Sequence, residues 1–203
     1  MNKRIGDWIE TFTGGQFWPL DPRPEDVNII DIAHSLSMQC RFNGHTRVFY
    51  SVAEHSVIVS KELKALGYNK LVQLYGLLHD AAEAYICDLP RPIKGQIKTY
   101  KAIEYWVQRA VWEAFKLPVP AGSTETAIHR MDKLLLGYEG RKLMRSADGW
   151  ASKFGDFTPK SITTLGLTHT LAKQYFLSLF ADLTGGRFGG RLRSQDADTW
   201  ITL

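Results

Sequence analysis

Apolar residues recur every three or four positions along most of the chain, which is the spacing that places side chains on one face of an α-helix. In chain order, this pattern predicts helices over about residues 26–39, 51–66, 70–87 and 97–115, one that begins after a cap at Ser123 or Thr124, and one over about 168–183. Ser51 can cap the second helix, with Glu54 three residues later as its capping-box partner.

The segments between these helices contain few strand signals. Residues 13–28 are rich in glycine and proline and are interpreted as a loop, and the pair Asn43-Gly44 is typical of a turn with left-handed backbone angles. Only 47–50 and 161–164 resemble strands, and both are short and isolated. We therefore expect an all-α fold.

The predicted helix over 70–87 is apolar on nearly all sides, so we expect it to be central and buried. His79, Asp80 and Glu83 interrupt its most apolar stretch. A buried charge needs a partner or a metal ion, because desolvation is otherwise costly. A single helical histidine is usually structural. A His-Asp pair with a glutamate four residues after the histidine, on the same helix face, instead favours a functional site.

Two further residues can join this group to form a metal site. His55 lies among apolar neighbours in the second predicted helix, and Asp132 does so in the fifth. Each alone is better explained as a surface or core residue, but together the four offer two imidazoles and two carboxylates. That mixture suits Mn²⁺, Co²⁺, Fe²⁺, Ni²⁺ or Zn²⁺ better than Mg²⁺, which prefers oxygen ligands. A closed structural zinc site would more often use cysteines, and Cys40 and Cys87 have no CxxC partners.

Composition excludes several classes of protein. With 203 residues, 44% of them apolar and 23% charged, the chain has the make-up of an ordinary globular domain rather than a disordered, collagen-like or disulfide-rich one. We expect one domain over 1–184 and a glycine- and arginine-containing tail over 185–203, interpreted as a solvated end rather than an RNA-binding segment. Without an apolar signal segment or spanning stretch, we expect a cytoplasmic protein that binds no membrane. The net charge of +4 suits an anionic small molecule as well as nucleic acid.

The order His55, then His79-Asp80, then Asp132 resembles the H…HD…D pattern of the HD-domain phosphohydrolases. The chain is most similar to the 5′-deoxynucleotidase branch, in the stretch 53–56 (Ala-Glu-His-Ser) and in the block 79–94, which matches without a gap. It also looks like phage members of that branch, some of which are triphosphohydrolases specific for dATP. The resemblance implies a helical bundle of about six or more helices around a metal site.

The resemblance also implies roles for individual residues. It makes His55, His79, Asp80 and Asp132 the ligands of a divalent transition metal, with Mg²⁺ as an additional ion on the substrate phosphates left open. Glu83 is expected to orient or deprotonate the attacking water, and Asp88 to act as a second acid–base group or to hold the sugar. The candidate substrate contacts, each with a plain surface or core role as its alternative, are Arg41, Phe42, His45, Lys94 and Trp18.

These roles predict hydrolysis of a deoxynucleotide between the α-phosphorus and O5′. A nucleotidase and a triphosphohydrolase break the same bond, so both substrates stay open, with dATP among them. The alternative from another class is a non-catalytic module that binds a nucleotide or nucleic acid and keeps a vestigial metal site. We expect a deoxynucleotide rather than nucleic acid as partner, and a homo-oligomer by analogy with the family.

Overall fold

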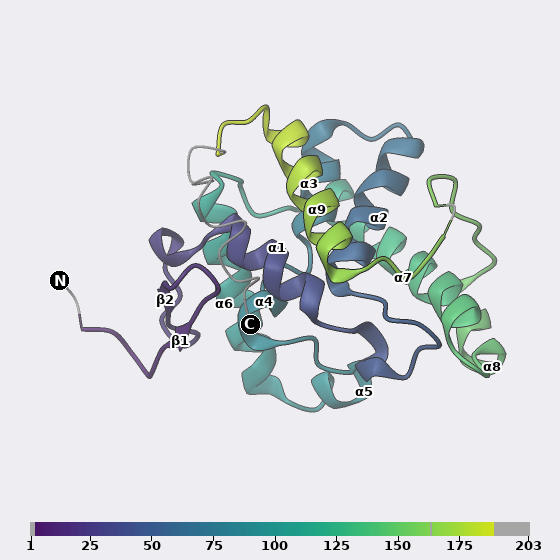
Figure 1. Cartoon of the computed structure of the whole chain (residues 1–203), viewed down its shortest axis with the longest axis horizontal. Coiled ribbons are helices and arrows are strands. Elements are labelled where there is room, and N and C mark those ends of the chain that lie inside the picture. Colours follow the sequence, from purple (N-terminus) through teal and green to yellow (C-terminus); the bar gives the residue numbers. More distant parts are fainter. Residues whose placement is uncertain (1–2, 163, 189–203) are drawn as a thin grey trace.

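Helices form most of the computed structural model, which describes residues 3–162 and 164–188 (Figure 1). The prediction of an all-α fold is confirmed. The α-helices are α1 Ile29–Met38, α2 Val52–Ala65, α3 Lys70–Leu78, α4 Glu83–Ile86, α5 Arg91–Lys94, α6 Lys98–Ala114, α7 Ser123–Leu143, α8 Asp148–Ala151 and α9 His169–Thr184. Short 3₁₀ helices span Pro24–Asp26, Arg41–Gly44 and Ser152–Phe154. Residues 189–203, which make up most of the predicted tail, lie outside the described residues.

Polar side chains start several of the helices by accepting a backbone N–H. Ser51 Oγ accepts from the N–H of Glu54 at 3.1 Å, as predicted. The returning half of the capping box is absent, because the Glu54 carboxylate instead bonds the N–H groups of residues 166 and 167. The cap predicted at Ser123 or Thr124 is also wrong. α7 begins at Ser123 after Gly122, which takes a positive φ of 59° that glycine adopts at little cost and has no side chain for capping.

A small hairpin at the start of the chain was missed by the pattern. β1 (Ile9–Glu10) pairs antiparallel with β2 (Gln16–Phe17), so part of the segment interpreted as a loop is a strand. Two-residue strands are too short for a periodic signal. The segment 47–50 forms no strand, and neither do the described residues of 161–164. No helix in residues 3–162 and 164–188 is long and apolar enough to cross a membrane.

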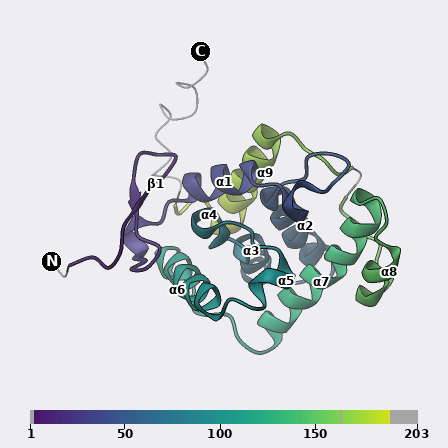
Figure 2. The ribbon, with the colours of Figure 1, turned by 90° about the horizontal axis from the view of Figure 1, so that it is seen from below.

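The centre of the molecule is the packed pair α2 and α3. α1 and α9 cover one side of this pair, and α6 and α7 lie on the other (Figure 2). Two clusters of buried apolar residues fill the space between them, one shared by α1, α2, α3, α6 and α9, and the other by α2, α3 and α7. Side chains carried by α2, by the end of α3 and by α7 therefore converge from different directions.

The helix predicted over 70–87 is not continuous, which corrects the sequence prediction. α3 ends at Leu78 and α4 begins at Glu83, and the backbone between them makes tighter bonds, such as Ala81 N–H to Leu78 O at 3.1 Å. The side-chain amide of Gln108 bonds both Leu78 O and Ala82 N–H, in place of the helical bond that would join these two groups. The apolar periodicity reports burial on this segment and cannot reveal a side chain inserted from another helix.

Candidate metal centre

His55 is the most deeply buried member of the predicted metal group. It lies on α2 with no exposed surface, and its Nδ1–H donates to Glu139 Oε1 at 2.6 Å. That bond leaves Nε2 directed toward two carboxylates, 3.3 Å from Asp132 Oδ1 and 3.9 Å from Asp80 Oδ2. A histidine held through Nδ1 by a carboxylate is the arrangement that orients imidazole for a metal.

His79 and Asp80 enter the same space from the turn that follows α3. His79 Nδ1–H donates to Gly76 O at 2.8 Å, which again leaves Nε2 free to face the cluster, 3.1 Å from Asp80 Oδ2. One ligand atom from each of His55, His79 and Asp80 lies within 4.8 Å of the others. The structure thus brings together three of the four predicted ligands, with Asp132 beside His55.

The donor set fits a metal ion on a direct observation. The Nε2 atoms of both His55 and His79 are buried and have no hydrogen-bond partner. Buried polar atoms are nearly always paired, because an unpaired one costs free energy. Two unpaired imidazole nitrogens that face carboxylates are explained if a cation binds between them.

Glu139 and Tyr50 belong to this site and were missed by sequence reasoning. Glu139 on α7 is fully buried, and Oε1 accepts from Tyr50 Oη–H at 2.7 Å as well as from His55. A signal existed: Glu139 follows Asp132 by seven residues, two helical turns along the same face of α7. This signal is weak, because a single glutamate in a long helix is usually exposed.

Arg41 faces the metal cluster, with only 8% of its surface exposed. Its Nε is 3.4 Å from Glu139 Oε2 and one terminal nitrogen is 3.5 Å from Asp80 Oδ2. The backbone turns sharply just after Arg41, where Phe42 and Asn43 have positive φ angles of 54° and 52°. The predicted left-handed turn is confirmed at Asn43, and it extends to Phe42, where it is uncommon for a bulky residue. This turn holds the guanidinium over the cluster.

The charges in this cluster depend on one another. Burial lowers the pKa of His55 and Arg41 acts in the same direction, but Glu139 and Asp132 outweigh both and raise that pKa to about 9. Burial raises the pKa of Asp132, but the adjacent His55 imidazole outweighs burial and brings that pKa down to about 2. The pKa of Asp80 likewise falls below its usual range despite burial, because of His79, His55 and Arg41. A metal ion would have to displace the proton from His55, so binding should release protons.

The two predicted acid–base residues lie at the edge of this cluster. Burial, and then the negative charges of Asp80 and Asp88, raise the pKa of Glu83 well above its usual value. Its Oε1 is 3.2 Å from Lys94 Nζ, whereas Oε2 is buried without a partner. Burial also raises the pKa of Asp88, although Arg41 opposes this.

Two of the remaining predicted substrate contacts, Lys94 and Phe42, contact residues of the cluster. Lys94 pairs with Glu83 and with Glu104, so its charge is already engaged. Phe42 lies under Arg41, with the guanidinium 5.7 Å from the ring centroid.

The other two have no described contact with the metal ligands. His45 is exposed beyond the turn. Trp18 packs near the start of the chain, 4.3 Å beneath the Arg4 guanidinium and 6.4 Å from Trp8, and the described contacts do not bring it to the metal ligands.

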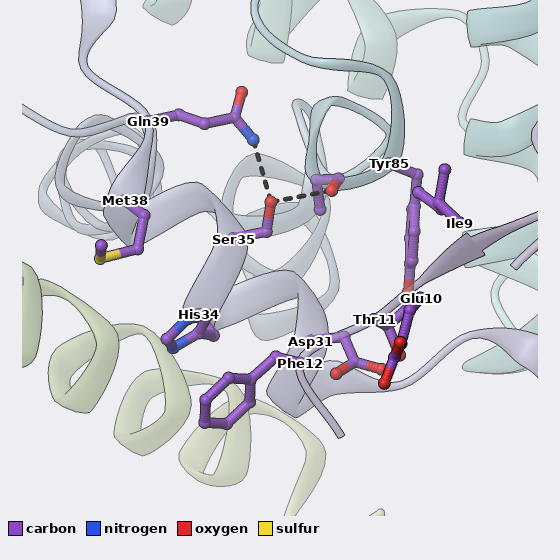
Figure 3. Close-up of a pocket in the computed structure, with 11 residues that line it drawn as sticks. Ile9, Glu10, Thr11, Phe12, Asp31, His34, Ser35, Met38, Gln39 and Tyr85 are labelled. Carbon is purple, nitrogen blue, oxygen red and sulfur yellow. Dashed lines mark hydrogen bonds between the residues drawn. The ribbon is translucent and has the colours of Figure 1, made fainter. Parts of the chain in front are cut away.

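A cavity of about 510 Å³ lies between the hairpin, α1 and α4 (Figure 3). Gln39 and Ser35 stand on its wall, and Phe12 stacks on His34 with ring centroids 3.7 Å apart. The metal ligands do not line it. It is therefore a separate space from the metal cluster.

The chain is similar in sequence to two bacterial proteins. No family model matches it. It is 33% identical over 178 residues to the uncharacterized protein YfdR of Escherichia coli K12, which covers 87% of this chain and 96% of YfdR. It is 34% identical over 168 residues to the uncharacterized protein RCAP_rcc00048 of Rhodobacter capsulatus, with 79% and 85% covered. Since the likeness to YfdR spans nearly all of both proteins, the chain belongs to the YfdR family.

Proposed function

We propose that this protein is a metal-dependent phosphohydrolase of the HD-domain type that hydrolyses deoxynucleotides between the α-phosphorus and O5′. The observation that carries the proposal is the pair of buried, unpartnered Nε2 atoms of His55 and His79, which face the carboxylates of Asp80 and Asp132. The order of these residues in the sequence, and the block 79–94, support the HD assignment and the substrate class.

The metal would be held by His55, His79, Asp80 and Asp132. Mixed imidazole and carboxylate donors suit Mn²⁺, Co²⁺, Fe²⁺, Ni²⁺ or Zn²⁺. When bound, such an ion lowers the pKa of a coordinated water and polarises a phosphate oxygen. Glu139 fixes the imidazole of His55 through Nδ1 and so keeps Nε2 available for the ion.

Proton transfer falls to Glu83 and Asp88. Glu83 has an unpartnered Oε2 that can accept the proton of the attacking water, and its raised pKa suits a group that must hold that proton near neutrality. Lys94 holds the other oxygen and so fixes the direction of the carboxylate. Asp88, whose pKa is also raised, can protonate the departing O5′.

Arg41 is the cation that we assign to the phosphate. Its guanidinium is buried beside Asp80, and it keeps its charge because burial, which would lower its pKa, is outweighed by Glu139 and Asp80. Arg91, with a terminal nitrogen 3.7 Å from Asp132 Oδ2 and a largely exposed side chain, can reach the far phosphates of a longer chain. Monophosphates and triphosphates are therefore both candidate substrates.

The test is release of phosphate or triphosphate from a panel of deoxynucleoside mono- and triphosphates, dAMP and dATP included, with Mn²⁺ or Co²⁺ and with chelator. We expect chelator-sensitive turnover, loss of metal and turnover in Asp80→Ala, and retention of metal with loss of turnover in Glu83→Ala. His129→Ala is the matched control, since His129 is exposed and contacts only Glu125 among the described ion pairs. Metal-loaded protein that binds nucleotides without hydrolysing any of them would contradict the proposal and favour a non-catalytic binding module.

A further inference from the structure

We propose that two glutamines, Gln39 just after α1 and Gln108 on α6, position the two halves of the segment 79–88, and that each half serves a different part of the site. Gln108 of α6 sets the turn that carries the metal ligands His79 and Asp80. Gln39, just after α1, sets the stretch that carries Glu83 and Asp88. This inference rests on the proposed function, because it assigns these residues to metal binding and to proton transfer.

Gln108 replaces a helical hydrogen bond with its own side chain. Its Oε1 accepts from Ala82 N–H at 2.9 Å, and its Nε2 donates to Leu78 O at 2.9 Å. In a continuous α-helix these two backbone groups would bond each other. The Gln108 amide separates these two backbone groups, and residues 79–82 form a turn instead of continuing the α-helix. Both metal ligands on this segment, His79 and Asp80, lie within that turn. Gln108 is 7% exposed, so water does not readily replace it.

Gln39 bridges two backbone groups at the other end of the segment, where the helical bond from Cys87 N–H to Glu83 O is kept. Its Nε2 donates to Glu83 O at 3.0 Å, and its Oε1 accepts from Asp88 N–H at 2.9 Å. The amide also donates to Ser35 Oγ at 3.0 Å, and Ser35 in turn donates to Ala84 O at 2.8 Å (Figure 3). One glutamine thus holds the backbone of both candidate acid–base residues.

The backbone between Glu83 and Asp88 requires such support. Cys87 has a φ of 68°, which a residue other than glycine adopts at a cost in free energy. Bonds on both sides of Cys87 hold it there. Glu83 O accepts from Cys87 N–H and from Gln39 Nε2, and Asp88 N–H donates to Gln39 Oε1. Because proton transfer depends on sub-ångström placement, loosening this stretch should slow the reaction without removing the metal.

The two glutamines lie on different parts of the chain, one just after α1 and one on α6, so their effects should separate. Neither amide is bonded to a metal ligand's side chain or to a carboxylate of the acid–base pair. They are positioning residues. Gln108 should govern metal affinity, and Gln39 should govern turnover once metal and substrate are bound.

The experiment compares Gln108→Ala and Gln39→Ala with Gln73→Ala. Gln73 is an apt control because it is also 7% exposed and its amide bonds a backbone carbonyl, that of Tyr68, outside the segment. Calorimetry gives the Kd for Mn²⁺, and steady-state kinetics give kcat and KM. We expect Gln108→Ala to weaken Mn²⁺ binding about tenfold or more. We expect Gln39→Ala to change the Kd by less than about twofold while kcat falls about tenfold at nearly constant KM.

Amide hydrogen exchange supplies a readout independent of activity. Gln39→Ala should expose the N–H of Asp88 and spare that of Ala82, and Gln108→Ala should do the reverse. Gln39→Glu keeps an acceptor for Asp88 N–H, so it should retain protection there and serve as the folded variant if the alanine change prevents folding; Gln108→Glu plays the same part for Ala82.

The possible failures are distinguishable. Wild-type protein that binds no Mn²⁺ or turns over no deoxynucleotide would overturn the proposed function and the division of roles with it. An active wild type whose two glutamine variants lose metal affinity and kcat in parallel, or behave like Gln73→Ala, would overturn the glutamine proposal alone.

Discussion

Two groups of buried polar side chains meet at α2, and they differ in how completely their atoms are bonded. Glu62 is 1% exposed and accepts hydrogen bonds from the backbone N–H groups of Lys160 and Ser161. Glu54, also 1% exposed, accepts from those of Gly166 and Leu167. These two glutamates fasten residues 160–161 and 166–167 to the helix.

The metal cluster has the opposite property. His55 is adjacent to Glu54 in the chain, yet its Nε2 has no partner, and neither has that of His79 or the Oε2 of Glu83. Burial of a charged residue alone therefore does not separate a structural role from a functional one. Several unsatisfied atoms in one cluster do separate a functional role from a structural one, because the fold gains nothing by leaving them unpaired.

The largest expected effect comes from breaking the unsatisfied group. Asp80→Ala should reduce Mn²⁺ affinity by more than about 100-fold, which exceeds the change typical for residues that only support a ligand. Turnover should fall with it, while the helical circular dichroism spectrum is retained. Calorimetry and the phosphate-release assay measure both. An Asp80→Ala protein with wild-type affinity would show that the cluster does not bind the metal.

Metal binding should stabilise the whole protein, because the ion binds only the folded cluster. Mn²⁺ at about 100 times its Kd should raise the free energy of unfolding by about 2.7 kcal/mol. Thermal denaturation with and without Mn²⁺ measures this shift. Glu62→Gln should show the same shift as the wild type, and Asp80→Ala should show none; equal shifts in all three would indicate non-specific binding.

The satisfied group should respond through stability instead. Glu62→Gln places an amide NH₂ against backbone N–H donors, so it should lower the free energy of unfolding by about 2 kcal/mol. Denaturant titration measures this loss. Mn²⁺ affinity should stay within about twofold of the wild type, because changes at distant, independent sites rarely affect each other by more than that. Wild-type stability would mean that Glu62 does not hold residues 160 and 161.

The smallest effect sharpens the boundary between the two groups. Tyr50→Phe removes one hydrogen bond to Glu139 and leaves the hydrogen bond from His55 and the ion pair with Arg41 in place. It should cost about 1 kcal/mol of stability and weaken Mn²⁺ binding by less than about tenfold. Both are read from the same denaturation and calorimetry experiments. A larger loss of affinity than in Asp80→Ala would place Tyr50 among the metal-binding groups.

Much of this molecule could be predicted because the signals are local. Apolar spacing located the long helices, and the hydroxyl of Ser51 and the pair Asn43-Gly44 marked a helix start and a turn that the structure has. The convergence of His55 with His79 and Asp80 followed from buried charge in apolar helices.

What could not be predicted depends on contacts between distant segments. The break after Leu78 arises from an amide on α6, which is far away in the sequence. Glu139 acquires its role only because α7 packs against α2. The engagement of Lys94 by Glu83 and Glu104 is likewise a tertiary contact.

The most direct test of the central claim is a single titration of the metal-free wild-type protein with Mn²⁺ in the presence of dAMP or dATP, with released phosphate or triphosphate measured at each step. The proposed function predicts that hydrolysis rises with occupancy of the site, is reversed by chelator and is absent in Asp80→Ala. Saturation with Mn²⁺ and no hydrolysis of any deoxynucleotide would contradict it.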